Sequence, residues 1–278
     1  MTVNREGFNQ SQPVPVPRTK ISGIWRLFSL PMLFFLSIPI IAIFLRISPA
    51  HLVENLRQPQ VLQAVGLSLV TTMISTLIII LAGTPLAFSH SRGQYRLSRV
   101  VDTLIDLPLV LPPAVAGVAL LIAFGRQGIL GRYLADFGMQ IAFTPLAVII
   151  VQVFVAAPFY IKSASLAFAN IDQELEHSAA LDGANSPQIF RYLTVPLSWS
   201  ALLGGSVMSW ARALGEFGAT IIFAGNFPGR TQTMPLAIYI GFEIDLDIAL
   251  TLSVILILLS FLALFVAKFI LNRDWMSG

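Results

Sequence analysis

The sequence predicts an all-α polytopic membrane protein with six transmembrane helices. Of its 278 residues, 56% are hydrophobic and only 11% are charged, whereas soluble domains carry roughly 25% charged residues. The mean hydropathy is +0.80. Six apolar runs are each long enough to cross a bilayer, which takes roughly 20 residues per helix, and none alternates as barrel strands do. The runs lie at about residues 27–47, 62–89, 101–125, 144–168, 197–225 and 246–271.

The chain begins with a polar stretch, residues 1–26, that contains Pro13, Pro15 and Pro17. Such a composition buries too little apolar surface to fold, so we expect a disordered cytoplasmic tail. The first apolar run is long and is followed by Pro49 rather than by a small-residue cleavage site, so we expect it to stay attached as a span. Residues 27–271 are then expected to form a single transmembrane domain, and residues 272–278 a short cytoplasmic tail.

Prolines within the apolar runs predict kinks or breaks in the helices. They are Pro85, Pro108, Pro112, Pro113 and Pro158. The pair Pro112-Pro113 interrupts backbone hydrogen bonding in the third run. Free carbonyls at membrane depth persist only when they are packed in protein or line a cavity. Two interpretations therefore stand for this pair: a wall of a transport pathway, or a packing kink.

Basic residues predict the orientation of the spans, because Lys and Arg are retained on the cytoplasmic side of the membrane. They gather before the first run, after the second, around the loop between the fourth and fifth, and at the end of the chain. This places both termini in the cytoplasm and makes the loop 170–196 cytoplasmic. The loops near 48–60, 126–143 and 226–245 are expected to face outward.

The segment 170–196 is the longest polar run between two apolar stretches. A helix is predicted over Ile171–Leu181, with acidic residues in its first turn, where the helix dipole favours negative charge. Gly183 suits the left-handed conformation that ends a helix, and Ser186-Pro187 suits the N-cap and first residue of the next helix. Two short helices meeting at Gly183 indicate a docking surface for a cytoplasmic partner. The alternative is a solvated loop that anchors the fourth and fifth spans.

These residues resemble the cytoplasmic EAA loop of importer-type ABC transporter permeases, which reads E-A-A, three residues, G, nine residues, I-x-L-P. When Gly183 is placed on the family glycine, Leu193 falls on the isoleucine and Pro196 on the proline. His177 stands at the family glutamate, and the adjacent Glu176 is expected to serve the same exposed role. In such permeases the loop inserts into a groove of the ATPase subunit and couples its closure to movement of the spans. The resemblance implies an ATPase-coupling surface formed by Glu176, His177, Ser178, Ala179, Gly183, Pro187, Leu193 and Pro196.

The fifth apolar run contains two ionisable residues, Arg212 and Glu216, which share a helix face because they are four residues apart. An ionised group near the bilayer centre costs on the order of 3 kcal/mol, and such groups usually face a bundle interior or a wet cavity. One interpretation is a neutralising pair that ties helices together. The other is an anion pathway, in which Arg212 attracts a passing oxyanion and Glu216 limits how tightly the anion is held.

The stretch GEFGAT…GNFPGRTQTMPL, which begins at Gly215, resembles the molybdate and tungstate permeases and, more loosely, the sulfate and thiosulfate permeases. The third run from Asp106 to Gly117 resembles the same group, and the resemblance covers about residues 60–270. It implies an importer-type ABC permease fold in a bacterial-type plasma (inner) membrane. It also implies a permease subunit for molybdate, or tungstate, that works as a homodimer in the lipid bilayer. The partners implied are a cytoplasmic ABC ATPase and an extracytoplasmic oxyanion-binding protein.

Other functions are constrained by what the sequence lacks. There is no G-x-x-x-x-G-K-[ST] motif, so ATP and Mg²⁺ are expected in the partner subunit and no enzyme activity in this chain. With no cysteine and with His51, His90 and His177 far apart in sequence, we expect no catalytic, metal or cofactor site, and no nucleic-acid partner is expected. A sulfate or thiosulfate permease is the alternative function. Two further hypotheses remain. One is a secondary transporter or channel, which would predict internal repeats and a proton relay, and the other is an intramembrane enzyme.

Overall fold

The computed structural model describes residues 23–93 and 98–275, and within these ranges the chain forms helices and connecting loops without a strand. The predicted all-α class is therefore confirmed. The chain divides into two compact units, residues 1–45 and 46–278. Helix α1 (Gly23–Arg46) accounts for the described part of the first unit. Residues 1–22 of the predicted tail lie outside the described residues, whereas its last four residues are the start of α1.

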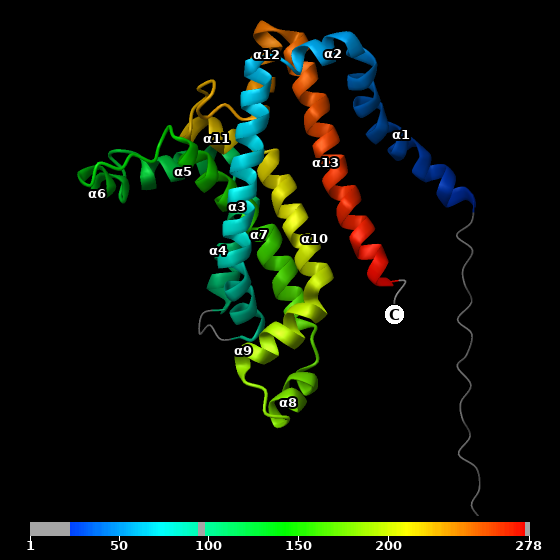
Figure 1. Cartoon of the computed structure of the whole chain (residues 1–278), viewed down its shortest axis with the longest axis vertical. Helices are drawn as coiled ribbons and strands as arrows, with labels where there is room; N and C mark the ends of the chain where they lie inside the picture. The colour runs from blue at the N-terminus through cyan, green and yellow to red at the C-terminus, as the bar shows by residue number, and fades with distance from the viewer. Residues whose placement is uncertain (1–22, 94–97, 276–278) are drawn as a thin grey trace, which may run out of the picture. The chain divides into compact units, whose positions relative to one another are not determined.

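The second unit contains the remaining helices, and its long members α3, α7 and α10 pack together (Figure 1). In chain order the elements are α2 (Pro49–Asn55), α3 (Pro59–Ser91), α4 (Ser98–Val110), α5 (Pro113–Phe124), α6 (Gly131–Asp136), α7 (Pro145–Ala169), α8 (Gln173–Leu181), α9 (Ser186–Ile189), the π-helical turn η1 (Phe190–Thr194), α10 (Val195–Leu214), α11 (Gly218–Phe223), α12 (Met234–Ile244) and α13 (Leu246–Trp275).

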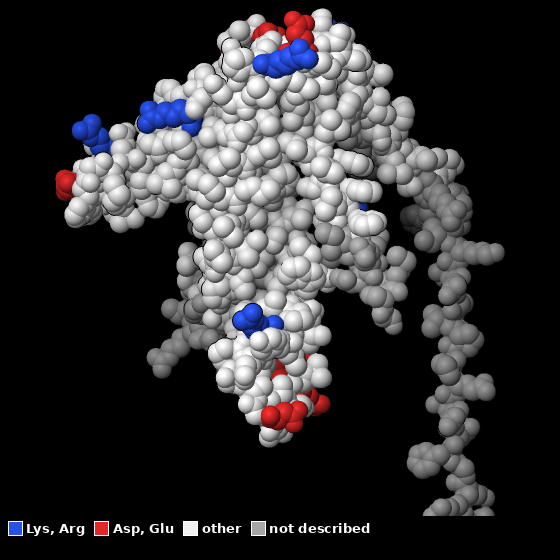
Figure 2. All heavy atoms as spheres, in the orientation of Figure 1, with Lys and Arg blue, Asp and Glu red and all other residues white. Residues whose placement is uncertain are grey.

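The predicted spans correspond to the long apolar helices. Four helices, α1, α3, α7 and α13, are each long and apolar enough to cross a membrane, and α4 with α5 passes the same test as one bent pair. The 20-residue helix α10 takes the place of the fifth predicted run and spans about 30 Å at a rise of 1.5 Å per residue. On the face drawn in Figure 2, charged side chains gather toward the ends of the second unit and along α6, and the middle is nearly uncharged. This is the surface of a multi-pass membrane protein.

The break predicted at Pro112-Pro113 is confirmed. Helices α4 and α5 are bent by 116° relative to each other at this point. Pro113 is the first residue of α5, where its missing N–H costs no intrahelical hydrogen bond. Helices α3, α4 and α7 each run on through their internal prolines, which are Pro85, Pro108 and Pro158.

Two predicted boundaries are wrong. The expected outward loop 226–245 contains α12, in which Met234 and Leu236 are fully buried; the helix forms because its apolar face packs against α13. The fifth run ends as a helix at Leu214, and the short helix α11 follows after a break. Within the expected tail 272–278, helix α13 continues as far as Trp275, and the last three residues lie outside the described part. Short helices, α2 and α6, also occupy the other two outward loops.

Hydrogen bonds between helices fix the packing of α3 against α7. The Gln152 side chain of α7 accepts a hydrogen bond from Ser75 at 2.9 Å and donates one to Thr71 at 3.1 Å. Further along the same two helices, the hydroxyls of Thr84 and Tyr160 lie 2.6 Å apart. Such bonds contribute on average about 0.6 kcal/mol each within a membrane. These hydrogen bonds hold α3 and α7 together along much of their length.

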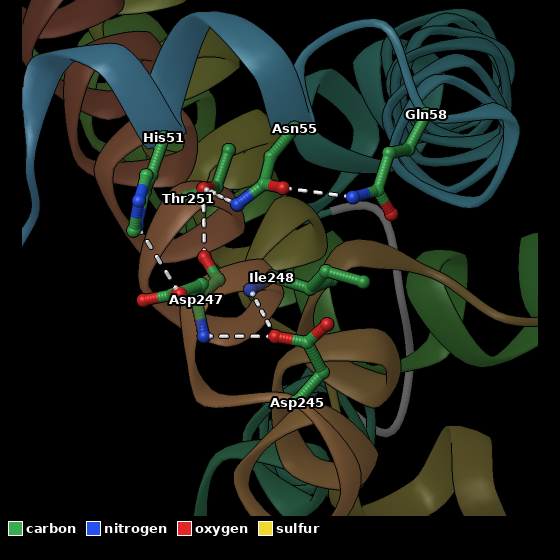
Figure 3. A network of polar contacts seen from close by, with 7 residues as sticks. All are labelled: His51, Asn55, Gln58, Asp245, Asp247, Ile248 and Thr251. Atoms are coloured by element: carbon green, nitrogen blue, oxygen red, sulfur yellow. Dashed lines mark hydrogen bonds and ion pairs between the residues drawn. The ribbon is translucent and has the colours of Figure 1, made fainter.

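At the end of the bundle opposite to α8 and α9, a polar network fastens α2 to α13 (Figure 3). The buried Asn55 side chain donates to the Thr251 hydroxyl at 3.1 Å. Asp245, between α12 and α13, accepts from the backbone N–H groups of Asp247 at 3.0 Å and Ile248 at 3.2 Å. Because the N–H groups at a helix start lack intrahelical partners, this carboxylate caps α13 and fixes the direction of the chain at the junction.

Candidate functional site

The polar segment between α7 and α10 folds as two short helices, as predicted. Asp172 caps the start of α8. The helix ends in a Schellman motif, in which the N–H of Ala184 donates to the carbonyl of Ala179 and the N–H of Gly183 to that of Ala180, both at 3.0 Å. Gly183 has φ +93°, in the left-handed region that glycine adopts without steric cost. The predicted helix end at Gly183 is confirmed.

The start of α9 differs from the prediction by one residue. Asn185, not Ser186, is the N-cap, and Pro187 is the second residue of the helix. Asn185 and Gln188 form a capping box: the Gln188 N–H donates to the Asn185 side chain at 3.0 Å, and the Asn185 N–H donates to the Gln188 side chain at 2.8 Å. The Asn-x-x-Gln spacing of this box was present in the sequence and outweighs the Ser-Pro signal.

The π-helical turn η1 joins α9 directly to α10, a feature that no sequence signal indicated. Phe190, at its start, lies with its ring centroid 5.0 Å from that of Phe88 in α3 and 6.1 Å from that of Phe168 in α7. Helix α9 is therefore continuous with α10 through η1, and η1 is packed onto the ends of α3 and α7.

Most of the predicted coupling residues lie on the surface of the segment 170–196, which contains α8 and α9 and is called the α8–α9 unit below. The exposed ones are His177, Ser178, Gly183, Pro187 and Pro196, whereas Ala179 and Leu193 are partly buried. Two further apolar side chains, Leu181 and Tyr192, are also exposed. The tip is acidic, as Figure 2 shows at the lower end of the molecule, through Asp172, Glu174 and Asp182. The unit therefore presents an apolar and acidic surface to the water around it.

Glu176 does not have the exposed role predicted for it. Its side chain is 18% exposed and forms an ion pair with Arg92, the C-cap residue of α3. The same carboxylate accepts a hydrogen bond from the Thr194 hydroxyl at 3.1 Å. Adjacent residues on a helix point about 100° apart, so when Glu176 faces α3 its neighbour His177 faces water. The exposed position that matches the family glutamate is therefore held by His177 alone.

A second constellation lies where α10 ends. Arg212 is in the last turn of α10, where the helix dipole favours a positive charge, and its guanidinium is 2.8 Å from the Glu216 carboxylate. Glu216 follows the end of the helix and also accepts from the Ala219 N–H at 2.9 Å. The Glu216 side chain is 1% exposed and that of Arg212 is 31% exposed. The predicted pair is present, and it links the end of α10 to the start of α11.

The proline break between α4 and α5 lies beside this pair. A Cβ atom added to Gly218 would be 2.7 Å from the Cβ of Pro113, and one added to Gly117 would be 2.9 Å from the carbonyl oxygen of Ala219. Helices α5 and α11 thus approach so closely that only glycine fits at either contact. The break between α4 and α5 and the break between α10 and α11 are about 100 residues apart in the sequence. In the structure they lie next to each other.

The family of proteins described as "Binding-protein-dependent transport system inner membrane component" matches residues 79–273, from α3 to α13. The chain belongs to this family. This inner membrane component is 41% identical over 215 residues to the molybdenum transport system permease protein ModB of Mycobacterium tuberculosis, with 77% of this chain and 81% of ModB covered. It is 33% identical over 222 residues to the sulfate transport system permease protein CysW of Escherichia coli, with 78% and 76% covered.

Solved structures show the same fold for this inner membrane component. It matches a chain of a bacterial ABC transporter that imports the polysaccharide alginate with a TM-score of 0.71, at 19% identity, covering 91% of this chain and 97% of that one. A chain of the MetNI methionine ABC transporter matches with a TM-score of 0.60, at 19% identity, covering 77% and 95%. The predicted family and the importer-type permease fold are confirmed.

Proposed function

We propose that this inner membrane component is the permease subunit of an ATP-driven importer for molybdate, with tungstate as a related substrate. The observation that carries the proposal is the exposed α8–α9 unit, which is joined through η1 to α10 and packed onto α3 and α7. The relatives named molybdenum transport permeases supply the substrate class. In this proposal both termini and the α8–α9 unit are cytoplasmic.

The partners follow from the same proposal. A separate cytoplasmic ATPase binds ATP and Mg²⁺ and docks on α8 and α9, so this chain itself catalyses no reaction. A second copy of the chain completes the pathway, and an oxyanion-binding protein delivers the anion on the outer side. Closure of the ATPase displaces α8 and α9, and the continuous helix through η1 carries the displacement along α10 to Arg212.

The pair of Arg212 and Glu216 is the proposed anion site on the pathway. Interrupted helices are found at membrane depth where they are packed in protein or line a cavity, and transporters place substrate sites at such interruptions. Here the breaks of two spans meet, and Arg212 is the more exposed partner of the pair. The guanidinium offers donors to an oxyanion, while the buried Glu216 competes for the same group and so allows release.

Sulfate or thiosulfate is the second candidate substrate, favoured by the 33% identity to CysW over 222 residues. Sulfate and molybdate are both tetrahedral dianions, so an arginine that binds one also attracts the other. The higher identity to ModB, 41% over 215 residues, favours molybdate.

Uptake of radioactive molybdate is the test of this proposal. In a strain that lacks its own molybdate importer, expression of the chain with its ATPase and its binding protein is expected to restore uptake. Unlabelled molybdate or tungstate in excess is expected to compete, and sulfate is not. Equal competition by sulfate would instead assign the chain to the sulfate group, and restored uptake with a hydrolysis-deficient ATPase would contradict an ATP-driven importer.

A further inference from the structure

One carboxylate oxygen holds three elements together beside the α8–α9 unit. The Oε1 atom of Glu176 in α8 accepts both from the Arg92 guanidinium at the end of α3 and from the Thr194 hydroxyl in η1. These residues are 84 and 18 positions from Glu176 in the sequence. The contact therefore joins the docking helix to one span that follows it directly and to another that comes much earlier in the chain.

The contact is sheltered from water. The side chain of Arg92 is 12% exposed, and Thr194 is fully buried. The Arg92 guanidinium lies over the ring of Phe88, 5.5 Å from its centroid, and Phe88 in turn packs edge-on against Phe190. Ion pairs in such surroundings are screened little by salt. Removing one partner is costly because it leaves the other charge buried and unpaired.

A groove of about 460 Å³ lies between the end of α3 and the two short helices, and Arg92 and Glu176 are both in its wall. The side chains of Arg92 and Glu176 meet across this groove. The route from α9 to α10 is the backbone of η1, whereas α8 and α3 are joined across the groove by the Arg92–Glu176 pair. The pair gives α8 a direct side-chain link to the end of α3, beside the contact that η1 makes with α3 through Phe190 and Phe88.

We propose that Arg92 is a positioning residue for transport, through which the movement of α8 is conveyed to α3. This inference rests on the proposed coupling function of α8 and α9. Arg92 touches neither substrate nor nucleotide in this role. It makes the α8–α9 unit act on two spans at once, α10 through η1 and α3 through Glu176, so that these spans move together when the ATPase closes.

The test is a double variant, Arg92→Met with Glu176→Met, in the complete transporter reconstituted in proteoliposomes. Replacing both partners of a buried ion pair by apolar residues of similar volume is often close to neutral for folding. We expect the complex to assemble and to hydrolyse ATP. The amount of molybdate imported per ATP hydrolysed is expected to fall about fivefold or more, the usual lower size of a coupling between sites. The matched control is Arg99→Met, which removes an exposed arginine near the start of α4.

Two milder variants keep the test decisive if the double variant fails to assemble. Thr194→Val removes the hydroxyl that Glu176 accepts from, and Glu176→Gln keeps the shape of the side chain but removes its charge. Both are expected to lower import per ATP hydrolysed without lowering the yield of assembled complex, a split that a purely structural contact would not produce. A wild-type ratio in the double variant, or in both milder variants, would overturn the role of Arg92.

The outcome is separable from that of the coupling proposal through Gly183→Val, which acts on α8 and α9 without touching Arg92. If Gly183→Val uncouples hydrolysis from import and the Arg92 variants do not, the inference about Arg92 is wrong and the coupling function stands. If neither set uncouples, the coupling function is wrong as well.

Discussion

Replacing Gly183 with valine is expected to uncouple ATP hydrolysis from molybdate uptake. Gly183 has φ +93°, and a β-branched residue held in that region costs about 1–3 kcal/mol. A Cβ atom at this position meets nothing within 4 Å, so the expected effect comes from the backbone and not from a clash. The chain relieves the strain by changing the turn between α8 and α9, which alters the surface that the ATPase contacts while the spans remain intact.

Matched substitutions separate this effect from general damage. Gly183→Asn is expected to keep more uptake than Gly183→Val, because asparagine tolerates the left-handed region. Gly138 has φ +76° in the loop after α6, also with nothing within 4 Å of an added Cβ. Gly138→Val therefore introduces the same strain elsewhere and is expected to keep hydrolysis and uptake coupled. Normal uptake per ATP hydrolysed in a purified Gly183→Val complex would show that α8 and α9 are not the coupling site.

Replacing Arg212 with glutamine is expected to lower anion flux more than assembly of the complex. Glutamine can still donate a hydrogen bond to Glu216, so the link between α10 and α11 is kept, but the positive charge is lost. Hydrogen bonds to charged groups contribute about 1.5–3 kcal/mol, so uptake per assembled complex is expected to fall about tenfold or more. The measurement is initial uptake of molybdate at equal amounts of assembled transporter.

Two controls distinguish a pathway residue from a structural one. Arg212→Lys keeps the charge and is expected to retain more uptake than Arg212→Gln. Glu216→Gln keeps the acceptor for the Ala219 N–H and leaves Arg212 without its counter-ion, so the anion is expected to bind more tightly and to leave more slowly. If Arg212→Gln reduces assembly while each assembled complex still transports at the wild-type rate, the pair only ties the helices together.

Features set by local sequence were predictable. The apolar runs predicted where the long helices lie, because the length of an apolar stretch decides whether it spans a bilayer; the exception is the end of the fifth run, where the helix stops at Leu214. Gly183 was identified as a helix end because few other residues adopt φ > 0, and the 116° break appeared at the one Pro-Pro pair within a span. The contact between Arg212 and Glu216 was predicted from their spacing of four residues, but Glu216 lies beyond the end of α10 and not on the same helix.

Features set by contacts between distant segments were not predictable. The burial of Glu176 depends on Arg92, 84 residues away, and a helix rotation of one residue decides whether Glu176 or His177 faces water. The segment that forms α12 was expected to be part of a loop, because its apolar stretch is short and polar residues precede it. In the structure it is a helix that packs against α13. The meeting of Pro113 with Gly218 and the π-helical turn likewise follow from packing, which one sequence does not reveal.

Uptake in proteoliposomes is the direct test of whether this inner membrane component is part of an ATP-driven importer. The chain would be reconstituted with its ATPase and with its binding protein loaded with molybdate, and molybdate entering the lumen would be measured with and without ATP and Mg²⁺ on the ATPase side. An ATP-driven importer is expected to show uptake that requires ATP and stops with a hydrolysis-deficient ATPase. Uptake that proceeds without ATP and follows an imposed ion gradient would contradict it and identify a secondary transporter.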